Sequence, residues 1–430
     1  MPQPLRHAST PAFLIRAATA VLAALTLAAC GQSPSTPSAD TAKLLTVPAP
    51  SGTTRGELQK RYPGAQVQAL YAGRAGFAVL RLSTGTSALQ AQALGAVEDA
   101  GHRVNSLQPG LSAAPGPHLS AQGGTPIWMD GGTPIWMDGG AVIWMDGGTP
   151  IWMDGGTPIW MDGNGNQVAQ GSNGAAWDAM GLREAQAARG GAAAGAGRTV
   201  AVIDGGLDLT HPLLQRRLTD PSTWRDLVDG DSTPAEGTPG AAGYGHGTAV
   251  AGLVAQVAPG AALLPIRVLD SEGQGTTDQL AEAIALAVDE GANVINLSLG
   301  VQDASPAIDA AIRYAVSRGV EVVTAAGNTG AGTMDFPAAL APDLHGEVSV
   351  GASVNGQWSQ PQVWSSGGMQ AELLAPGKDL VTAAPAGGAA RWTGTSMATA
   401  VASGALALKP DLAGDRATGQ AGTARFTDLR

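Results

Sequence analysis

Four polar residues between positions 204 and 396 have the side chains that acyl transfer requires. A serine hydroxyl is a weak nucleophile at neutral pH, so it needs a base to accept its proton and donors to stabilise the oxyanion that forms. Ser396 in GTSMA offers a nucleophile, and His246 in GYGHGT offers a base. Asp204 in VIDGG offers an acid, and Asn328 in AAGN offers an oxyanion donor. This set predicts chemistry of the Ser-His-Asp type.

Ser396 alone fits two interpretations. The apolar run at residues 397–408 contains one glycine and no proline, and predicts a buried helix that begins at the serine. The first backbone N–H groups of a helix have no intrahelical acceptor and can bind an anion. Serine also caps ordinary helices. The nucleophile interpretation therefore depends on the three residues upstream.

A regular alternation of strands and helices is predicted from residue 199 onward. Apolar runs of strand length alternate with stretches of helical spacing, which indicates a parallel sheet covered by helices, with active residues at the carboxyl ends of strands. The predicted strands are residues 199–204, 263–269, 293–299, 320–325 and 348–352, and the predicted helices are residues 248–257, 277–289 and 306–317. The fold class is α/β.

The motifs around these residues resemble those of the subtilisin-like serine peptidases. VIDGG with THPLL, GHGT, NLSLG, AAGN, LAPG and GTSMA occur in the family's order between about residues 199 and 408. The resemblance implies a three-layer fold with a mostly parallel sheet between helices, occupying residues 166–430. It also implies a serine endopeptidase that hydrolyses peptide bonds in polypeptide substrates through an acyl-enzyme.

The same resemblance implies a role for each site residue. Ser396 would attack the carbonyl, His246 would carry the proton, Asp204 would orient the imidazole, and Asn328 would bind the oxyanion together with the Ser396 N–H. Substrate binding is implied for an edge strand with Ser298, Leu299 and Gly300, and for a pocket wall with Ala325, Ala326 and Gly327.

The chain departs from the family's usual residues at three positions near these motifs. Gly205 stands where Thr or Ser is common in the family, Ala249 where His is common, and Ala400 where Pro is common. None of these changes removes a reacting group.

Two other polar residues are interpreted without a catalytic role. His211 is expected to be structural, and Asp208 is expected in the loop beyond the first strand.

The N-terminus predicts export. Residues 17–29 form an apolar run too short to span a bilayer comfortably, and it ends in LAAC at Cys30. This resembles a bacterial lipobox, which implies a signal peptide at residues 1–29, lipid attachment to Cys30 and a Ser/Thr/Pro-rich tether at residues 30–46. The alternative is an ordinary secretory signal with an incidental Cys30. The expected location is the cell envelope, or outside the cell after processing.

Residues 47–118 are expected to form a small α+β domain. Strands are predicted at residues 66–70, 76–82 and 103–107, and a helix at residues 87–100. By resemblance this domain would be a propeptide that folds on the enzyme in cis and inhibits it. Self-cleavage is expected between about residues 107 and 176.

Residues 119–165 contain five copies of an eight-residue unit, GGTPIWMD, with one variant copy. An even period would place every Trp on one face of an extended chain, so a short stacked β structure that packs or self-associates is one interpretation. A poorly ordered linker and a calcium-binding repeat are the alternatives, although each unit offers a single carboxylate.

Composition limits the classes of partner. The net charge is −11, and from residue 166 onward there are 15 Lys and Arg against 26 Asp and Glu, which argues against nucleic acid as a partner. One cysteine excludes an intrachain disulfide.

The proposed chemistry needs no cofactor and no metal, and structural Ca²⁺ is left open. The competing function class is a lipid-anchored binding or structural protein with an inactive peptidase fold.

Overall fold

The computed structural model describes residues 44–70, 76–82, 97–99, 103–105, 140–145, 151–154, 159–161, 173–301, 304–354, 357–408, 410, 425–426 and 429. All of them lie in one compact unit, Thr41–Arg430. Cys30, the predicted signal peptide and most of the predicted tether lie outside the described residues. Within the described part, every helix is too short or too polar to cross a bilayer.

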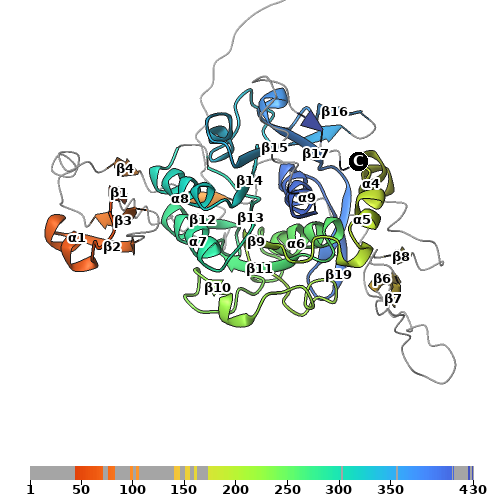
Figure 1. Cartoon of the computed structure of the whole chain (residues 1–430), viewed down its shortest axis with the longest axis horizontal. Coiled ribbons are helices and arrows are strands. Elements are labelled where there is room, and N and C mark those ends of the chain that lie inside the picture. The colour runs from red at the N-terminus through yellow and green to blue at the C-terminus, as the bar shows by residue number, and fades with distance from the viewer. Residues whose placement is uncertain are drawn as a thin grey trace, which may run out of the picture. The chain divides into compact units, whose positions relative to one another are not determined.

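A nine-stranded sheet forms the centre of the C-terminal region (Figure 1). Its strands pair in the order β10-β11-β9-β13-β14-β15-β17-β20, all in parallel, and β16 pairs antiparallel with β15. In chain order the strands are β9 (Thr199–Asp204), β10 (Arg225–Asp226), β11 (Ala262–Arg267), β13 (Val294–Leu297), β14 (Glu321–Ala325), β15 (Glu347–Val354), β16 (Gln357–Pro361), β17 (Leu373–Pro376) and β20 (Arg425–Phe426).

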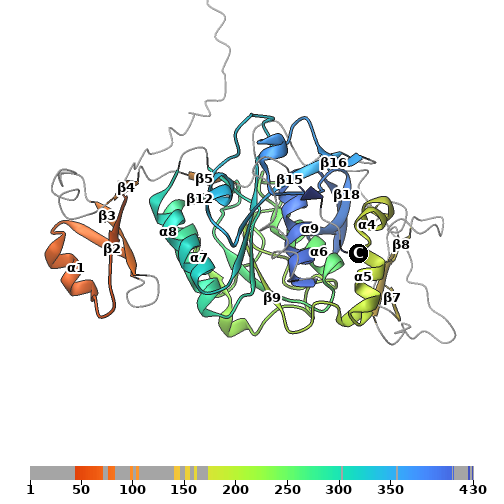
Figure 2. The same ribbon diagram turned by 45° about the horizontal axis from the view of Figure 1, so that its top comes forward.

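Helices cover both faces of this sheet (Figure 2). Helices α6 (His246–Val257) and α9 (Thr395–Leu408) share one buried apolar cluster, and α7 (Thr277–Asp289) and α8 (Pro306–Ser317) share another. Alternate residues of β9 enter the two clusters, because successive side chains of a strand point to opposite faces. Both faces of the sheet are therefore buried, which explains the unbroken apolar runs in the sequence.

The predicted α/β fold is confirmed. Each of the five strands and three helices predicted after residue 199 is present, with ends that differ by at most two residues. The predicted helix at residues 397–408 is also present and begins two residues earlier, as α9.

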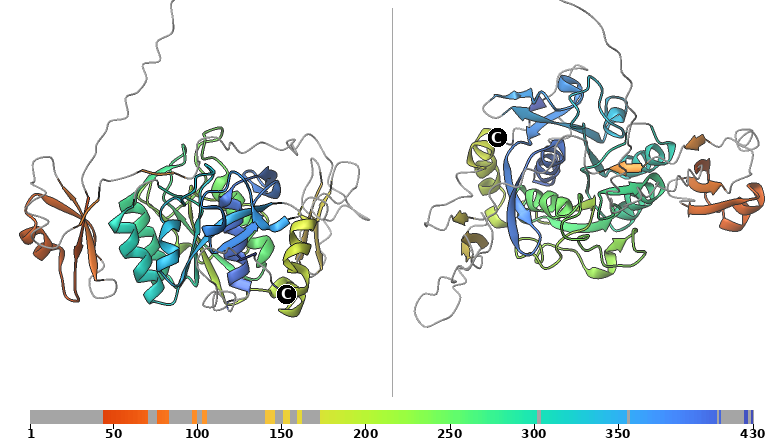
Figure 3. Two further views of the ribbon diagram at one scale, coloured as in Figure 1. Left: turned by 90° about the horizontal axis from the view of Figure 1, so that it is seen from above. Right: turned by 180° about the vertical axis from the view of Figure 1, so that it is seen from behind.

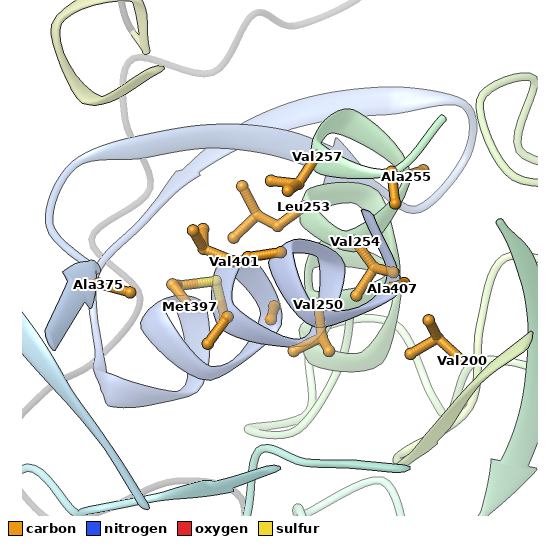
Figure 4. Close-up of a cluster of buried hydrophobic side chains, with 14 of the residues drawn as sticks. Val200, Val250, Leu253, Val254, Ala255, Val257, Ala375, Met397, Val401 and Ala407 are labelled. Atoms are coloured by element: carbon orange, nitrogen blue, oxygen red, sulfur yellow. The ribbon is translucent and has the colours of Figure 1, made fainter. Parts of the chain in front are cut away.

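Helices α6 and α9 pack directly against each other (Figure 4). Val250 and Val254 of α6 lie beside Met397 and Val401 of α9 in one buried cluster. A Cβ at Gly404 would lie 2.7 Å from the Cβ of Val257, so glycine at this position allows the two helices to approach closely. This packing connects the helix that begins with His246 to the helix that carries Ser396.

Shorter elements complete the C-terminal region (Figure 3). A hairpin of β18 (Leu380–Ala384) and β19 (Gly388–Trp392) precedes α9. The remaining elements are α4 (Gly174–Met180), α5 (Leu182–Ala188), β12 (Gln274–Thr276) and four 3₁₀ helices at Gly191–Ala193, Pro221–Thr223, Ala338–Asp343 and Gly368–Gln370.

The N-terminal region forms an antiparallel sheet in the order β2-β3-β1-β4 with its own apolar core. Its elements are β1 (Leu44–Pro48), α1 (Arg55–Arg61), β2 (Ala65–Leu70), β3 (Phe77–Leu82) and β4 (Val97–Asp99), followed by β5 (Arg103–Asn105). The helix predicted at residues 87–100 is wrong at its end, because Val97 pairs with Thr46 as a strand. The start of that predicted helix lies outside the described residues.

Copies three to five of the repeat supply three strands, β6 (Gly140–Met145), β7 (Ile151–Asp154) and β8 (Ile159–Met161). They pair in the order β7-β6-β8. β6 and β8 are parallel, and Trp144 lies opposite Trp160. This pairing agrees with the β interpretation for these copies, and the first two copies lie outside the described residues.

Candidate active site

The predicted site residues meet at one edge of the central sheet. Asp204 is the last residue of β9, Ser298 follows β13 directly, and Asn328 lies three residues beyond the end of β14. These three strands are adjacent and parallel, so their carboxyl ends lie at the same edge. Residues far apart in the sequence are thereby brought to one place.

His246 and Asp204 form a buried pair. The imidazole Nδ1 lies 2.8 Å from Asp204 Oδ1 and 3.0 Å from Oδ2, and both side chains are buried. A carboxylate only accepts hydrogen bonds, so Nδ1 is the protonated nitrogen and Nε2 is left as a base. The N–H of Gly205 also donates to Asp204 Oδ1, at 2.7 Å.

Two opposing effects act on the pKa of His246. Burial lowers this pKa, but the charge of Asp204, the hydrogen bond to Asp204 and the charge of Glu236 raise it, and the net direction is upward. The indole of Trp392 contacts the imidazole edge to face, with ring centroids 6.0 Å apart. A raised pKa means that the imidazole accepts a proton more readily than an isolated histidine.

Glycine after His246 permits the start of α6 to lie against the loop that follows β9. A Cβ at Gly247 would lie 2.1 Å from the carbonyl oxygen of Gly206 and 3.3 Å from the Cβ of Asp204. Any side chain at this position would push the two segments apart. The distance between His246 and Asp204 therefore depends on this glycine.

Ser396 is the second residue of α9 and is buried. Its hydroxyl donates to the carbonyl oxygen of Ser298 at 3.2 Å, and Ser298 Oγ donates to the carbonyl oxygen of Ser396 at 2.9 Å. Among the hydrogen bonds of the described residues, none joins Ser396 to His246. Catalytic hydrogen bonds are often long or absent without substrate, so rotation about the Cα–Cβ bond would precede reaction.

Asn328 is oriented by the start of α9. Its Oδ1 accepts from the backbone N–H of Thr395 at 2.8 Å and from Thr395 Oγ1 at 3.0 Å. Thr395 Oγ1 in turn accepts from the N–H of Gly327 at 3.2 Å. Since a backbone N–H can only donate, the amide oxygen faces Thr395 and the Nδ2 group is directed elsewhere as a donor.

A buried polar network behind Ser396 was missed from the sequence. Asn296 Nδ2 donates to Ser298 Oγ at 3.0 Å, and Ser403 Oγ donates to Asn296 Oδ1 at 2.9 Å. These side chains connect β13 to the middle of α9 and hold the backbone of Ser396. The available signal was a polar residue inside each of two apolar runs, since buried polar groups need partners.

Glu236 was also missed, and it contacts the start of α6. Its two carboxylate oxygens accept from the N–H of Gly245 at 2.9 Å, the N–H of Thr248 at 3.1 Å and the hydroxyl of Thr248. Burial raises the pKa of Glu236 to about 7, against the lowering effect of these hydrogen bonds. This carboxylate caps α6 from the loop that leads into the helix, nine residues before Gly245, a separation that no helix-capping pattern in the sequence indicates.

His211 and Asp208 bind the loop after β9 to the β18–β19 hairpin. His211 Nε2 donates to the carbonyl oxygen of Gly388 at 2.9 Å, because Nδ1 accepts from the N–H of Leu213 at 3.1 Å. Asp208 Oδ2 accepts from the N–H of Gly387 at 3.1 Å. Burial lowers the pKa of His211. Both residues have structural contacts, as predicted for His211.

The two predicted substrate segments flank Ser396. Segment 298–300 follows the end of β13, and the next residue, Val301, forms an antiparallel bridge with Phe336. The role of this segment as an edge strand for substrate stays a prediction. Segment 325–327 ends β14 and leads into Asn328. Leu299, Ala325 and Ala326 are buried.

The described residues contain no cluster of three or more His, Cys, Asp or Glu side chains suited to a metal ion.

Sequence comparisons agree with this geometry. Residues 195–416, which include all four predicted catalytic residues, match the Subtilase family. The chain is 36% identical over 222 residues to a thermophilic serine proteinase of Bacillus sp. (strain AK1), covering 49% of this chain and 52% of that protein. It is 34% identical over 226 residues to thermitase of Thermoactinomyces vulgaris (50% and 76%), and 36% identical over 223 residues to subtilisin Savinase of Lederbergia lenta (50% and 76%).

The match thus spans about half the length of the Bacillus proteinase and about three quarters of the other two relatives. The family match covers more than half of this chain and contains the whole site described above. The chain belongs to the subtilase family.

Proposed function

We propose that this protein is a serine endopeptidase that hydrolyses polypeptides with Asp204, His246 and Ser396. The observation that carries the proposal is the buried pair in which Asp204 lies 2.8 Å from Nδ1 of His246. This pair fixes the tautomer with a basic Nε2, at the sheet edge where Ser396 begins a helix. Names of the relatives, such as thermitase and subtilisin, support the same class of activity.

Acylation would begin when the Ser396 hydroxyl leaves the carbonyl oxygen of Ser298 and passes its proton to Nε2 of His246. The alkoxide forms a bond to the substrate carbonyl carbon, and the resulting imidazolium is stabilised by Asp204. Collapse of the tetrahedral intermediate breaks the C–N bond. His246 then gives its proton to the leaving amine.

Two hydrogen-bond donors would stabilise the oxyanion of the tetrahedral intermediate. Asn328 Nδ2 is one donor, and the backbone N–H of Ser396 in the first turn of α9 is the other. Deacylation repeats the sequence with water as the nucleophile and restores the Ser396 hydroxyl. The reaction needs no cofactor.

A fluorophosphonate probe tests this function, because such probes react with an activated serine. The processed protein is expected to be labelled at Ser396, and labelling is expected to vanish in Ser396→Ala and His246→Ala. Mass spectrometry of the labelled peptide identifies the serine. A folded protein without labelling would support the alternative, a binding or structural protein with an inactive fold.

We also propose that residues 47–118 act as a propeptide in cis. Three contacts support this role. Arg81 Nη2 lies 3.1 Å from Asp278 Oδ2 of α7, Phe77 and Val79 enter the apolar cluster of α7 and α8, and β5 pairs antiparallel with β12. Leu44, at the start of β1 and just before this segment, enters the same cluster. The N-terminal sheet is thus docked on two helices of the peptidase domain through both charge and apolar contact.

Self-cleavage between about residues 107 and 176 would separate this domain. The native chain and Ser396→Ala are compared by intact-mass spectrometry after expression in the same host. Only the native chain is expected to lose its N-terminal region. Identical processing of both chains would mean that another peptidase cuts the precursor.

Export with a lipid anchor at Cys30 is proposed for the precursor, on the LAAC motif at the end of the apolar run. Metabolic labelling with an alkyne fatty acid is expected to mark the N-terminal fragment of the native chain but not of Cys30→Ser. Equal release of both chains without label would favour an ordinary secretory signal.

A further inference from the structure

Asp335 is held between the two predicted substrate segments by its backbone. The N–H of Asp335 donates to the carbonyl oxygen of Ala326 at 3.0 Å. The next residue, Phe336, exchanges two backbone hydrogen bonds with Val301, at 2.8 and 2.9 Å. The chain at Asp335 is therefore attached to segment 325–327 on one side and to the end of segment 298–300 on the other.

The carboxylate of Asp335 lies against the two glycines of these segments. A Cβ at Gly327 would lie 2.4 Å from Asp335 Oδ2 and 2.7 Å from its Cγ. A Cβ at Gly300 would lie 3.4 Å from the Cβ of Asp335 and 3.9 Å from Oδ2. Asp335 is 9% exposed. A side chain at Gly327 would displace the carboxylate, whereas a Cβ at Gly300 would be in ordinary van der Waals contact with Asp335.

These segments also approach the proposed reaction centre. Segment 298–300 begins with the residue whose carbonyl oxygen accepts from the Ser396 hydroxyl. Segment 325–327 ends at Gly327, whose N–H donates to Thr395 and which precedes Asn328. A substrate carbonyl bound between Ser396 and Asn328 would place the side chain of its own residue between the two segments, where the Asp335 carboxylate lies.

We propose that Asp335 makes the enzyme select Lys or Arg as the residue immediately before the scissile bond. The inference rests on the peptidase function proposed above. A carboxylate in a buried site forms charge-assisted hydrogen bonds with an ammonium or guanidinium group, and repels an acidic side chain. An apolar side chain would desolvate the carboxylate without compensating it.

The charge of the whole chain acts in the same direction. The net charge of −11 falls on residues 166–430, so the region with the site attracts cationic peptides from solution. Long-range attraction is screened by salt, whereas a contact with a buried carboxylate is screened much less. The preference for a basic residue should therefore persist at high ionic strength.

The test uses the full chain after it has processed itself, with a matched series of peptides that differ only in the residue before the cleaved bond: Lys, Arg, Leu, Phe or Glu. The native enzyme is expected to have the highest kcat/KM for Lys or Arg. Asp335→Asn keeps the size of the side chain and removes its charge. It is expected to lower kcat/KM for the basic peptides about 10- to 100-fold and to leave or improve that for Leu and Phe.

Asp343→Asn is the matched control, since this exposed carboxylate lies on the following 3₁₀ helix and contacts no proposed substrate segment. It is expected to leave all five rates unchanged. Inhibition of the native enzyme by peptide aldehydes that end in argininal or leucinal gives a second measurement that needs no variant. Tighter inhibition by the argininal compound is expected.

Three outcomes overturn the inference. The native enzyme could cleave the Leu or Phe peptide faster than both basic peptides, leucinal could inhibit better than argininal, or Asp335→Asn could lower all rates by one common factor. If Ser396 is labelled by the fluorophosphonate probe in these cases, the specificity inference fails alone. If Ser396 is not labelled and no peptide is cleaved, the proposed function fails with it.

Discussion

Asn328 illustrates how one side chain at this site has two tasks. Its Oδ1 accepts two hydrogen bonds from Thr395 and so helps to hold the start of α9, while its Nδ2 group is the proposed oxyanion donor. An alanine substitution would remove both contributions together. A substitution that retains the oxygen separates them.

Asn328→Asp keeps an acceptor for Thr395 but replaces the donor with a carboxylate oxygen. We expect kcat to fall by about 10²–10³ or more, since one oxyanion donor is lost and a negative charge lies near the oxyanion. KM and the melting temperature should change little. Steady-state kinetics and thermal unfolding measure these effects, and an unchanged kcat would remove Asn328 from the mechanism.

Among the elements, α6 depends most on contacts made by its first residues. The helix begins at His246, its N-terminus is capped by Glu236 from the loop that leads into it, and Gly247 lies against Gly206. Thr248 Oγ1 also accepts from the N–H of Asp208 at 2.7 Å. The position of the imidazole is therefore set by tertiary contacts around one helical turn.

Gly247→Ala should displace this turn, because its Cβ would lie 2.1 Å from the carbonyl oxygen of Gly206. We expect a loss of stability at the upper end of single-substitution effects, about 4 kcal/mol, and loss of activity. Gly332→Ala is the control, since a Cβ there meets nothing within 4 Å. Urea unfolding of both variants provides the comparison, and equal stabilities would contradict the packing argument.

Glu236→Gln should alter the pH dependence of catalysis. The charge of Glu236 helps to raise the pKa of His246 after burial has lowered it. The carboxylate, whose own pKa is about 7, carries this charge over the upper part of the acidic limb. Without it the pKa of His246 is lower, and the imidazole stays neutral to lower pH. The acidic limb of the kcat/KM profile is therefore expected to move to lower pH.

Glu272→Gln, at an exposed position, is the control for that profile and should leave the limb in place. A limb that does not move in Glu236→Gln would mean that Glu236 has no electrostatic effect on His246, and a limb that moves to higher pH would contradict the direction of that effect. Measuring both variants at two salt concentrations separates this buried interaction from surface charge.

At the scale of the whole molecule, an acidic group lies at the opposite edge of the sheet from the site. Glu347 is the first residue of β15 and is fully buried, with Thr324 Oγ1 donating to Oε1 at 3.3 Å. Burial, followed by the nearby charges of Glu372 and Asp309, raises the pKa of Glu347 to about 9. The protonated form is therefore the folded form at neutral pH.

A carboxyl whose pKa is raised on folding stabilises the protein fully below its unfolded pKa, and this contribution is lost as pH rises toward the folded pKa. Stability of the native chain should thus fall between about pH 4.5 and pH 9. Glu347→Gln resembles the protonated acid, so its melting temperature should fall less over this range.

Thermal unfolding in the Ser396→Ala background avoids self-digestion during these measurements. Glu184→Gln, an exposed site in α5, should retain the pH dependence of the native chain. Parallel curves for Glu347→Gln and the native chain would show that Glu347 titrates normally.

Several features of this protein were determined by the sequence alone. Strands buried on both faces leave continuous apolar runs, so the α/β fold could be predicted. Each residue of the proposed site, Asp204, His246, Asn328 and Ser396, lies in a short local motif, so this set could be proposed from the sequence. Helices α7 and α8 were predicted with their observed ends, since the polar residues Thr276 and Ser305 directly precede them and their apolar spacing is regular.

Only the tertiary structure decided which other side chains serve the site. Asn296, Ser403 and Asp335 contact residues of other elements, and Glu236 caps α6 from nine residues before Gly245. No helix or strand spacing encodes such contacts. The strand at Val97–Asp99 was mistaken for helix for the same reason, because pairing with β1 overrides local periodicity. Short motifs of neighbouring residues therefore carry the proposed reacting groups. The contacts that cap α6, hold Ser396 and place Asp335 depend on which segments the fold brings together.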